Sequence, residues 1–374
     1  MNDRQQDADT RYLREALDLA RKGRAQASPN PHVGAVLVRD GAVVGRGFHT
    51  WAGVKHAEIL ALEEAGGQAR GSTLYINLEP CCHQGRTGPC TAALIEAGVA
   101  RVVAALEDPN PLVGGDGLRQ LRAAGIAAEI ATGFSAEAEK LNEGFVHFMR
   151  TRLPLVTLKT ALTLDGKIAA PDDNSGWITS DKARADVQQL RHDSGAILTG
   201  IGTVLADDCL LTDRTGLPRS RPLLRIVLDS RLRLPLDSQM VRSAAADLLV
   251  VGTSAAPAER RKALETHGAR VLILDGRDGR SDLRATIEAV AHEQYLSVLI
   301  EAGAKVNWAA LETGVADKVF FYYAPKILGG LESLSVAGGV GRRRRADAIR
   351  VHRTELHHIA PDEFAVEGYI VKGA

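Results

Sequence analysis

The stretch from His56 to Cys90 constrains the fold of this chain more than any other feature of the sequence. It begins with His-Ala-Glu, ends with Glu-Pro-Cys-Cys-His-Gln-Gly-Arg-Thr-Gly-Pro-Cys, and holds three of the four cysteines. Zinc binds imidazole nitrogen and thiolate sulfur, and three such protein ligands leave a fourth position for water. Four cysteines in 374 residues do not form a disulfide framework, so their clustering favours a metal site in a reducing compartment. The fold must therefore bring both ends of this stretch together.

The predicted zinc ligands are His56, Cys81 and Cys90, and Glu58 is the predicted proton shuttle. Zinc lowers the pKa of a bound water from about 15.7 to roughly 7. Glu58 lies two residues after the histidine, so on a helix its side chain leaves in a different direction and meets the water. Cys90 lies just before a predicted helix, whose N-terminal dipole favours a thiolate. His-x-Glu followed by Pro-Cys and a further cysteine is the signature of zinc-dependent deaminases.

Other interpretations of these residues stay open at this point. Cys82 competes with Cys81 for the metal; we prefer Cys81 because it follows Pro80, and we expect Cys82 to be a packed thiol. Cys81 and Cys90 could instead be two unreactive thiols or a disulfide, or the ion could be purely structural. A structural ion would leave Glu58 and the open coordination position without a purpose.

Length and composition predict a two- or three-domain protein, at ~150 residues per domain. Lys and Arg number 46, as do Asp and Glu, so the formal net charge is zero. Sequence-independent binding to nucleic acid needs a basic surface, and we expect no nucleic-acid partner. The polar start of the chain does not resemble a signal peptide, and no run of ~18 apolar residues occurs. These features predict a cytoplasmic protein without a membrane span.

Strands and helices alternate through both halves of the chain, which predicts α/β layer folds. In the first half we expect helices over residues 11–22, 91–97, 118–124 and 136–149 and after His56, with strands over 33–38, 73–78, 102–106 and 126–130 and a hairpin turn at Asp40-Gly41. Pro154 ends the first half, and we place the boundary near Arg152. In the second half we expect strands over 155–163, 196–199, 223–228, 248–251, 271–274, 297–301 and 318–324, and helices over 180–192, with Ser180 as N-cap, 257–266, 282–293 and 306–312.

The eight residues between Cys81 and Cys90 depart from the Pro-Cys-x-x-Cys spacing of other deaminases. This longer loop resembles the bifunctional deaminase/reductase family of riboflavin biosynthesis, as do Ser28-Pro29-Asn30-Pro31, Asp108-Pro109-Asn110-Pro111 and His147-Phe148-Met149-Arg150-Thr151. The resemblance covers nearly the whole chain. It implies a cytidine-deaminase-like α/β/α domain over residues 1–151 and a dihydrofolate-reductase-like α/β domain over residues 152–374.

For the first domain, the resemblance implies one zinc ion per chain and a small-molecule substrate, 2,5-diamino-6-ribosylamino-4(3H)-pyrimidinone 5′-phosphate. The residues implied to contact its pyrimidine and ribose are Asn30, His49, Asp108 and Asn110. His83 and Arg86 are implied to face the phosphate, and cationic donors suit a dianion. Considered alone, Asn30 and Asn110 are also ordinary turn residues beside prolines, and His49 could be a surface histidine.

The second half carries a weaker signal for a nucleotide site. Gly200-Ile201-Gly202-Thr203 lacks the third glycine of a dinucleotide fingerprint. The apolar residues 296–300 run into Glu301-Ala302-Gly303-Ala304, where backbone N–H groups at a helix start could face phosphate. Glycine after a strand is also ordinary loop geometry.

The resemblance sharpens this prediction through the segments 158–169, 177–180, 202–208 and 324–330. It implies a reductase that uses NADPH to convert the ribosyl chain of the deaminated product to ribityl. The implied cofactor contacts are Ala161, Trp177, Thr203, Asp207, Ser230, Gly303, Ala304, Lys305, Val306, Asn307, Trp308 and Ala309. The implied substrate contacts are Ser175, Arg191, Leu211, Arg214 and Glu301; the arginines suit a phosphate and Glu301 suits ribose hydroxyls.

Lys159 is the candidate for assisting protonation or polarisation during hydride transfer, with a lysine extended along a strand edge as the alternative. Cys209 stands where the family usually has proline. The run Arg342 to Arg345 is interpreted as a solvated loop, with anion contact as the alternative.

The rival function is a nucleic-acid-editing deaminase with an RNA-binding second half. It needs an electropositive face and aromatic stacking residues, and zero net charge with 7 Phe, 6 Tyr and 3 Trp argues against it. The resemblance also implies a homo-oligomer.

Overall fold

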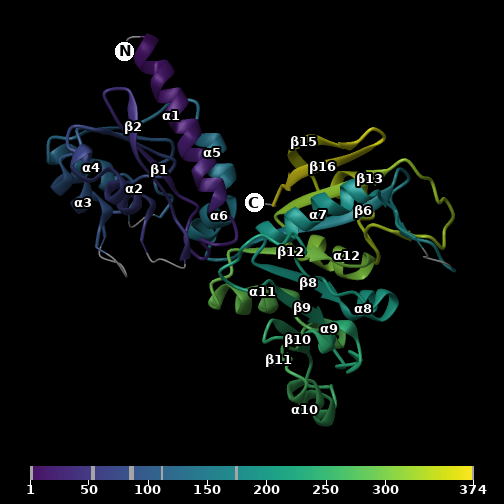
Figure 1. Cartoon of the computed structure of the whole chain (residues 1–374). Coiled ribbons are helices and arrows are strands. Elements are labelled where there is room, and N and C mark those ends of the chain that lie inside the picture. Colours follow the sequence, from purple (N-terminus) through teal and green to yellow (C-terminus); the bar gives the residue numbers. More distant parts are fainter. Residues whose placement is uncertain (1–2, 52–54, 84–87, 111–112, 173–175, 373–374) are drawn as a thin grey trace. The chain divides into compact units, whose positions relative to one another are not determined.

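The structure of the chain is a computed structural model that describes residues 3–51, 55–83, 88–110, 113–172 and 176–372. The chain divides into two compact units, shown in Figure 1. The first comprises Met1–Arg152 with Pro218–Arg221, and the second comprises Leu153–Leu217 with Pro222–Ala374. Among the described residues, no helix combines the length and the apolar character that crossing a membrane requires.

The first unit is built on a five-stranded sheet in the order β2-β1-β3-β4-β5. Its strands are β1 (Gly34–Arg39), β2 (Ala42–Phe48), β3 (Thr73–Ile76), β4 (Arg101–Ala104) and β5 (Ala127–Ile130). β1 runs antiparallel to both β2 and β3, whereas β3, β4 and β5 are parallel. The predicted hairpin turn is confirmed: Asp40 and Gly41 both have positive φ, which the tight β1–β2 connection requires.

Alternating side chains of these strands pack against helices on both faces. Leu37, Leu74 and Val102 pack on one face, which is covered by α2 (Ala57–Ala65), α3 (Cys90–Ala97) and α4 (Asp116–Ala123). The intervening Val36, Tyr75 and Val103 pack on the other face against α1 (Asp3–Lys22) and α5 (Ser135–Leu141). The period of two along each strand thus gives an α/β/α sandwich.

The expectation of a single helix over residues 136–149 is wrong. The structure has two helices there, α5 and α6 (Glu143–Thr151), which are separated at Asn142. The Asn142 side chain is buried; its Oδ1 accepts the N–H of His32 at 2.7 Å, and its Nδ2 donates to the His32 carbonyl at 2.9 Å. Asn142 therefore leaves the helical path in order to pair with a distant loop, which apolar spacing does not reveal.

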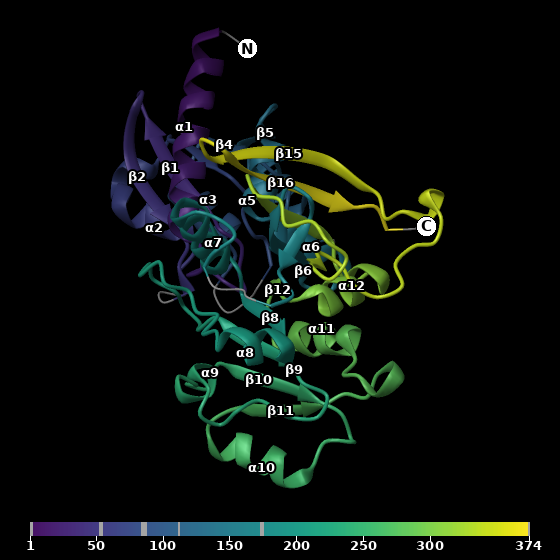
Figure 2. The same ribbon diagram turned by 90° about the vertical axis from the view of Figure 1, so that its right-hand side faces the viewer.

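The second unit holds a nine-stranded sheet in the order β11-β10-β9-β8-β12-β6-β13-β16-β15. Neighbouring strands from β11 to β13 are parallel, and β16 and β15 add antiparallel strands at one edge (Figure 2). The bounds are β6 (Leu155–Thr163), β8 (Ala196–Gly200), β9 (Leu224–Leu228), β10 (Leu248–Gly252), β11 (Arg270–Ile273), β12 (Ser297–Glu301), β13 (Lys318–Ala324), β15 (Val351–Ala360) and β16 (Glu363–Ile370). A separate pair joins β7 (Lys167–Ala169) to β14 (Leu334–Ser335).

Helices cover this sheet on both faces. α11 (Leu283–His292) and α12 (Ala304–Glu312) pack on one core, and α8 (Ile201–Asp207), α9 (Gln239–Arg242) and α10 (Ala258–Thr266) pack on the opposite one. α7 (Asp181–Asp193) packs against the side chains of β13 and β16. The N-cap prediction is confirmed, because Ser180 Oγ accepts the N–H of Ala183.

The C-terminal hairpin of β15 and β16 was not predicted. Two glutamates of β16 point inward: Glu363 accepts the N–H of Ser180, and Glu367 pairs with Lys318. These inward charges disrupt the alternation of apolar and polar residues by which a strand is identified from sequence. α8 was missed for a different reason, because it begins directly after Gly200 without an intervening loop.

Candidate active sites

Three predicted ligands converge in the first unit. His56 is the N-cap of α2, Cys81 follows the carboxyl end of β3, and Cys90 is the first residue of α3. His56 Nδ1 lies 3.2 Å from Cys90 Sγ and 3.5 Å from Cys81 Sγ, and all three ligand atoms lie within 4.8 Å of one another. In a tetrahedral zinc site, nitrogen and sulfur ligands lie about 3.5 Å apart. The donor set and its spacing therefore fit zinc.

The cluster stabilises a thiolate at Cys81. A hydrogen bond from the Cys90 thiol and contact with His56 lower the pKa of Cys81 to about 4, although burial opposes this. The backbone N–H of Cys90 also points at Cys81 Sγ, at 3.4 Å. The adjacent Cys81 sulfur and burial raise the pKa of Cys90. The start of α3 thus directs a backbone N–H toward the Cys81 sulfur.

Glu58 and Cys82 differ sharply in their surroundings. Glu58 is buried in the first turn of α2, and burial raises its pKa to about 7. A carboxyl group that titrates near neutrality can both accept and donate a proton. Cys82 is only partly buried, and the cluster found among the described residues contains Cys81 in its place.

Asn30 and His49 lie beside the metal ligands. Asn30 Nδ2 is 2.9 Å from His49 Nε2, and His49 Nδ1 is 2.9 Å from the Lys55 carbonyl oxygen. A carbonyl only accepts, so His49 carries a proton on Nδ1. Burial lowers the pKa of His49. The rings of His49 and His56 are 5.2 Å apart, edge to face. The alternative of a surface histidine is wrong, because His49 is buried.

The remaining predicted deaminase residues lie on two loops. Burial raises the pKa of Asp108 to about 6, and its Oδ1 accepts the N–H of Asn110 at 2.8 Å. His83 is exposed. Arg86 lies outside the described residues.

Glu79 is a residue that the sequence did not single out. Its buried carboxylate accepts three backbone N–H groups from the loop that carries Asp108 and from α4, which follows it: those of Asp108 at 3.0 Å, Gly115 at 2.9 Å and Leu118 at 2.9 Å. Its position two residues before Cys81 was the available signal, but a glutamate there gives no indication of three distant backbone partners.

In the second unit, Glu301 joins two cations. It ends β12 and pairs in register with Lys159 of β6, whose Nζ lies 3.3 Å from Glu301 Oε2. Arg191 of α7 donates hydrogen bonds to both carboxylate oxygens of Glu301, through Nε at 2.7 Å and Nη2 at 2.9 Å. Burial alone would raise the pKa of Glu301, but Lys159 and Arg191 lower it to about 2.

This geometry changes the interpretation of all three side chains. Lys159 is not extended along a strand edge, because its side chain is only 12% exposed and lies against Glu301. Arg191 directs two guanidinium nitrogens, Nε and Nη2, at the Glu301 carboxylate. Both oxygens of Glu301 face cations rather than open space.

The other predicted substrate residues of this unit lie near α7. Leu211 is buried and has a φ of 51°, in the left-handed region. Arg214 is exposed, and its backbone N–H donates to Gln188 Oε1 at 2.9 Å. Ser175 lies outside the described residues.

The predicted cofactor residues gather partly at the carboxyl edge of the parallel strands. Thr203 lies in α8 directly after β8, and Gly303 is the N-cap of α12 directly after β12. A Cβ on Gly303 would lie 3.9 Å from Thr203 Oγ1, so this hydroxyl adjoins the start of α12. Such a helix start with a glycine at the end of a parallel strand fits a phosphate group.

Other predicted cofactor residues have distinct positions. Ser230 Oγ accepts the N–H of Ser281 at 3.0 Å, Asp207 is exposed, and Ala161 is half-buried in β6. The Trp177 ring is exposed beneath the Arg184 guanidinium, and Arg342 lies over the Trp308 ring. Asn307 is fully buried and donates to the Val336 carbonyl at 2.8 Å, so it faces the interior of the unit; Lys305, Val306 and Ala309 share α12 with it.

Comparison with known proteins matches each half of the chain to a family model. The family model for the cytidine and deoxycytidylate deaminase zinc-binding region matches residues 6–106, and that for the RibD C-terminal domain matches residues 154–362. The riboflavin biosynthesis protein RibD of Escherichia coli is 41% identical over 366 residues, which cover 95% of this chain and 97% of the relative. The chain belongs to the RibD family. RibD of Actinobacillus pleuropneumoniae is 40% identical over 95% of this chain and 93% of its own length.

Solved RibD structures share the whole fold. Acinetobacter baumannii RibD superposes with a TM-score of 0.86 at 37% identity, covering 98% of this chain and all of that one. The diaminohydroxyphosphoribosylaminopyrimidine deaminase/5-amino-6-(5-phosphoribosylamino)uracil reductase of Thermotoga maritima gives 0.81 at 33% identity with equal coverage. The predicted deaminase-like and reductase α/β domains are thereby confirmed. The chain is an enzyme of riboflavin biosynthesis with a deaminase and a reductase activity, and the comparisons do not favour nucleic-acid editing.

Proposed function

We propose that the first unit deaminates 2,5-diamino-6-ribosylamino-4(3H)-pyrimidinone 5′-phosphate with one zinc ion, and that the second unit reduces the product with NADPH. The name of the Thermotoga maritima relative supports this pair of reactions. The observation that carries the proposal is the convergence of His56, Cys81 and Cys90 beside the buried carboxyl of Glu58. A structural zinc site would not need a buried proton carrier.

In the deaminase, His56, Cys81 and Cys90 would hold zinc, which supplies a water of lowered pKa when bound. Glu58 would take the proton that this water releases and pass it to the departing amino group, which leaves as ammonia. The pKa of about 7 that burial gives Glu58 suits both transfers.

Substrate recognition would come from the two loops beside this cluster. Asn30, His49, Asp108 and Asn110 would orient the pyrimidine and the ribose, with His83 and Arg86 toward the phosphate. The Lys55 carbonyl accepts from His49 Nδ1 and the Asn30 amide faces Nε2, so the ring offers a fixed pattern of donor and acceptor.

In the reductase, the start of α12 at Gly303 and the Thr203 hydroxyl would hold NADPH, which supplies the hydride when bound. Ring opening of the aminoribose to an imine makes C1′ the hydride acceptor. Lys159 would polarise or protonate this group, and Glu301 orients the lysine through their 3.3 Å contact. The remaining contacts proposed from the resemblance are Ala161, Trp177, Asp207, Ser230 and residues 304–309 for the cofactor, and Ser175, Arg191, Leu211 and Arg214 for the substrate.

The deciding experiment supplies the diaminopyrimidine nucleotide to the full-length zinc enzyme and follows ammonia release, then NADPH oxidation. We expect both, in that order. Ammonia without NADPH oxidation would refute the proposal for the second unit, and absence of ammonia release would refute it for the first. Salt-sensitive binding of single-stranded RNA would instead support the rival function. We further propose a homo-oligomer, to be checked by sedimentation.

A further inference from the structure

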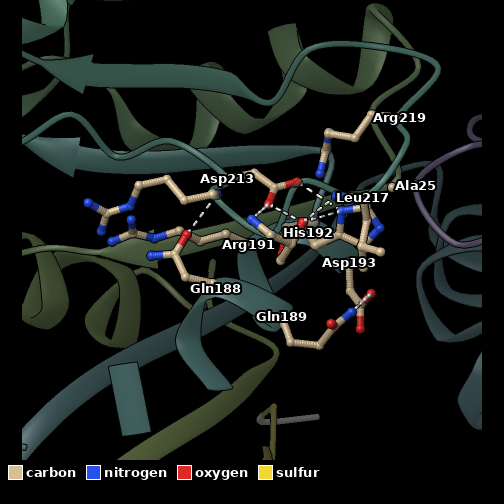
Figure 3. Close-up of polar contacts among 12 residues, drawn as sticks. Ala25, Gln188, Gln189, Arg191, His192, Asp193, Asp213, Leu217 and Arg219 are labelled. Atoms are coloured by element: carbon tan, nitrogen blue, oxygen red, sulfur yellow. Dashed lines mark hydrogen bonds and ion pairs between the residues drawn. The ribbon is translucent and has the colours of Figure 1, made fainter. Parts of the chain in front are cut away.

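Three consecutive residues, 212–214, each form a hydrogen bond with a side chain on one face of α7. Arg191 Nη1 donates to the carbonyl of Thr212 at 3.2 Å, and Gln188 Oε1 accepts the N–H of Arg214 at 2.9 Å. Between these contacts, His192 Nδ1 lies 2.8 Å from Asp213 Oδ2 (Figure 3). Residues 188, 191 and 192 have the spacing i, i+3, i+4 and so share a helix face. α7 therefore holds each of residues 212, 213 and 214 in place.

The pair of His192 and Asp213 is the most buried of these contacts. The two side chains are 3% and 7% exposed, respectively. The second carboxylate oxygen of Asp213 accepts both the N–H of Thr215 at 3.0 Å and its hydroxyl at 2.7 Å. Asp213 thus joins α7 to Thr215, and each of its two carboxylate oxygens has a partner within the protein.

This fixed segment adjoins two proposed reductase residues. Leu211, just before it, adopts a left-handed conformation with a φ of 51°, which a non-glycine residue keeps only where its surroundings hold it. Arg214, at its end, is exposed, so a long cation projects from a backbone that α7 holds in place. Because this backbone is already ordered, binding of an anion by the Arg214 side chain costs less conformational entropy.

The same face of α7 also contacts Glu301, the partner of Lys159. Arg191 contacts Thr212 through Nη1 and grips Glu301 through Nε and Nη2, and Glu301 in turn contacts Lys159. A shift of residues 212–214 would therefore disturb the guanidinium that orients Glu301. His192 and Asp213 hold the segment against such a shift.

We propose that His192 and Asp213 are a positioning pair of the reductase. They hold residues 212–214 on α7, so that Arg214 meets the phosphate of the substrate while Arg191 stays on Glu301. This inference rests on the proposed reductase function and adds two residues to it, neither of which contacts the substrate directly.

The test compares His192→Leu with His192→Asn in the full-length zinc enzyme. The amide nitrogen of Asn occupies nearly the place of His Nδ1 and can donate to Asp213, whereas Leu cannot. We expect His192→Leu to raise the KM for 5-amino-6-(5-phosphoribosylamino)uracil by about tenfold or more, the loss typical of one buried hydrogen bond to a charged group. The kcat should change less, and His192→Asn should restore the KM.

The phosphate supplies the decisive control. With the same substrate lacking its phosphate, His192→Leu and the wild-type enzyme should have similar KM values, because Arg214 then has no anion to meet. Equal losses on both substrates, or an unchanged KM on the nucleotide, would overturn the inference. The kcat of NADPH oxidation reports whether the second unit of the variant, which carries the change, is folded.

If His192→Leu does not fold, Asp213→Asn and a double variant with Arg214→Ala take its place. The KM increases of Asp213→Asn and Arg214→Ala should not multiply when the two changes are combined, because both act on one contact. Independent, multiplying effects would contradict the inference. Failure of the underlying function is separately visible, since the wild-type enzyme would then not oxidise NADPH with this nucleotide at all.

Discussion

The carboxylate of Glu79 accepts the backbone N–H of Asp108 across 3.0 Å, and so links the loop before the metal ligands to the loop expected to bind substrate. The same carboxylate holds Gly115 and Leu118 at the start of α4. Gly117 allows this close approach, because a Cβ there would lie 2.2 Å from the Pro80 carbonyl oxygen. Cys81 and Asp108 are therefore positioned by one shared residue.

Glu79→Gln should raise the KM of deamination by about tenfold or more while zinc is retained. The amide leaves one oxygen for three buried N–H donors, and each unsatisfied group costs about 1–3 kcal/mol. Steady-state ammonia release and metal content measure this. Glu107→Gln is the matched control, since Glu107 is exposed on the same loop. An unchanged KM in Glu79→Gln would show that the loop keeps its position without the carboxylate.

Glu58→Gln should keep zinc yet lower kcat for deamination by ~10²-fold or more, because glutamine cannot carry the proton. NADPH oxidation with the deaminated nucleotide should be unaffected. Glu63→Gln changes an exposed glutamate of the same helix and should leave both rates unchanged. Full turnover by a zinc-loaded Glu58→Gln enzyme would exclude Glu58 as the proton shuttle.

Cys81→Ser should abolish zinc binding, and Cys82→Ser should not. Only Cys81 belongs to the cluster with His56 and Cys90, so the adjacent cysteine is an internal control for loop disruption. Zinc per chain, measured on purified protein, distinguishes the two. Loss of zinc in both variants would mean that the loop, rather than one thiolate, determines the metal content. Chelation of zinc should stop ammonia release and leave NADPH oxidation intact.

The stability of the second unit should fall in acid as Glu301 becomes protonated. Its pKa is lowered to about 2 in the folded state, against about 4.3 in an unfolded chain, so the unfolded state takes up the proton first. The stabilisation is therefore complete above about pH 4.3 and is lost as the pH falls toward 2. Glu301→Gln should lack this part of the pH dependence.

Hydrogen exchange of the β6 and β12 amides across this pH range measures the local free energy of opening. Glu312→Gln, an exposed change at the end of α12, should keep the wild-type profile. Parallel profiles for the wild-type enzyme and Glu301→Gln would show that the carboxylate contributes no stability as an ion. The Glu301→Gln chain should also lose NADPH oxidation, because Lys159 and Arg191 would face a neutral group.

The sequence predicted most helices and strands from their apolar periodicity, and it predicted the zinc ligands from their positions at the ends of those elements. His56 and Cys90 lie at helix starts and Cys81 lies in the loop after β3, so identifying those elements was enough to bring the ligands together. Glu79, Asn142 and the pair of His192 and Asp213 were missed. Each is a buried polar side chain whose partner lies 21 to 110 positions away, and such contacts leave no periodic pattern. The β15–β16 hairpin was missed for a related reason, because its inward residues are partly glutamates with distant partners.

Asn142 also sets the shortest chain that could serve as a separate deaminase. Its side-chain amide forms hydrogen bonds with the backbone N–H and carbonyl of His32, close to Asn30 in the chain. The match to the zinc-binding region ends at residue 106. A fragment ending there would lack these hydrogen bonds and the α5 residues that cover one face of the sheet. Because α6 ends at Thr151 and β6 begins at Leu155, a separate deaminase that keeps every described helix of the first unit would end in the short stretch between them and would lack Pro218–Arg221.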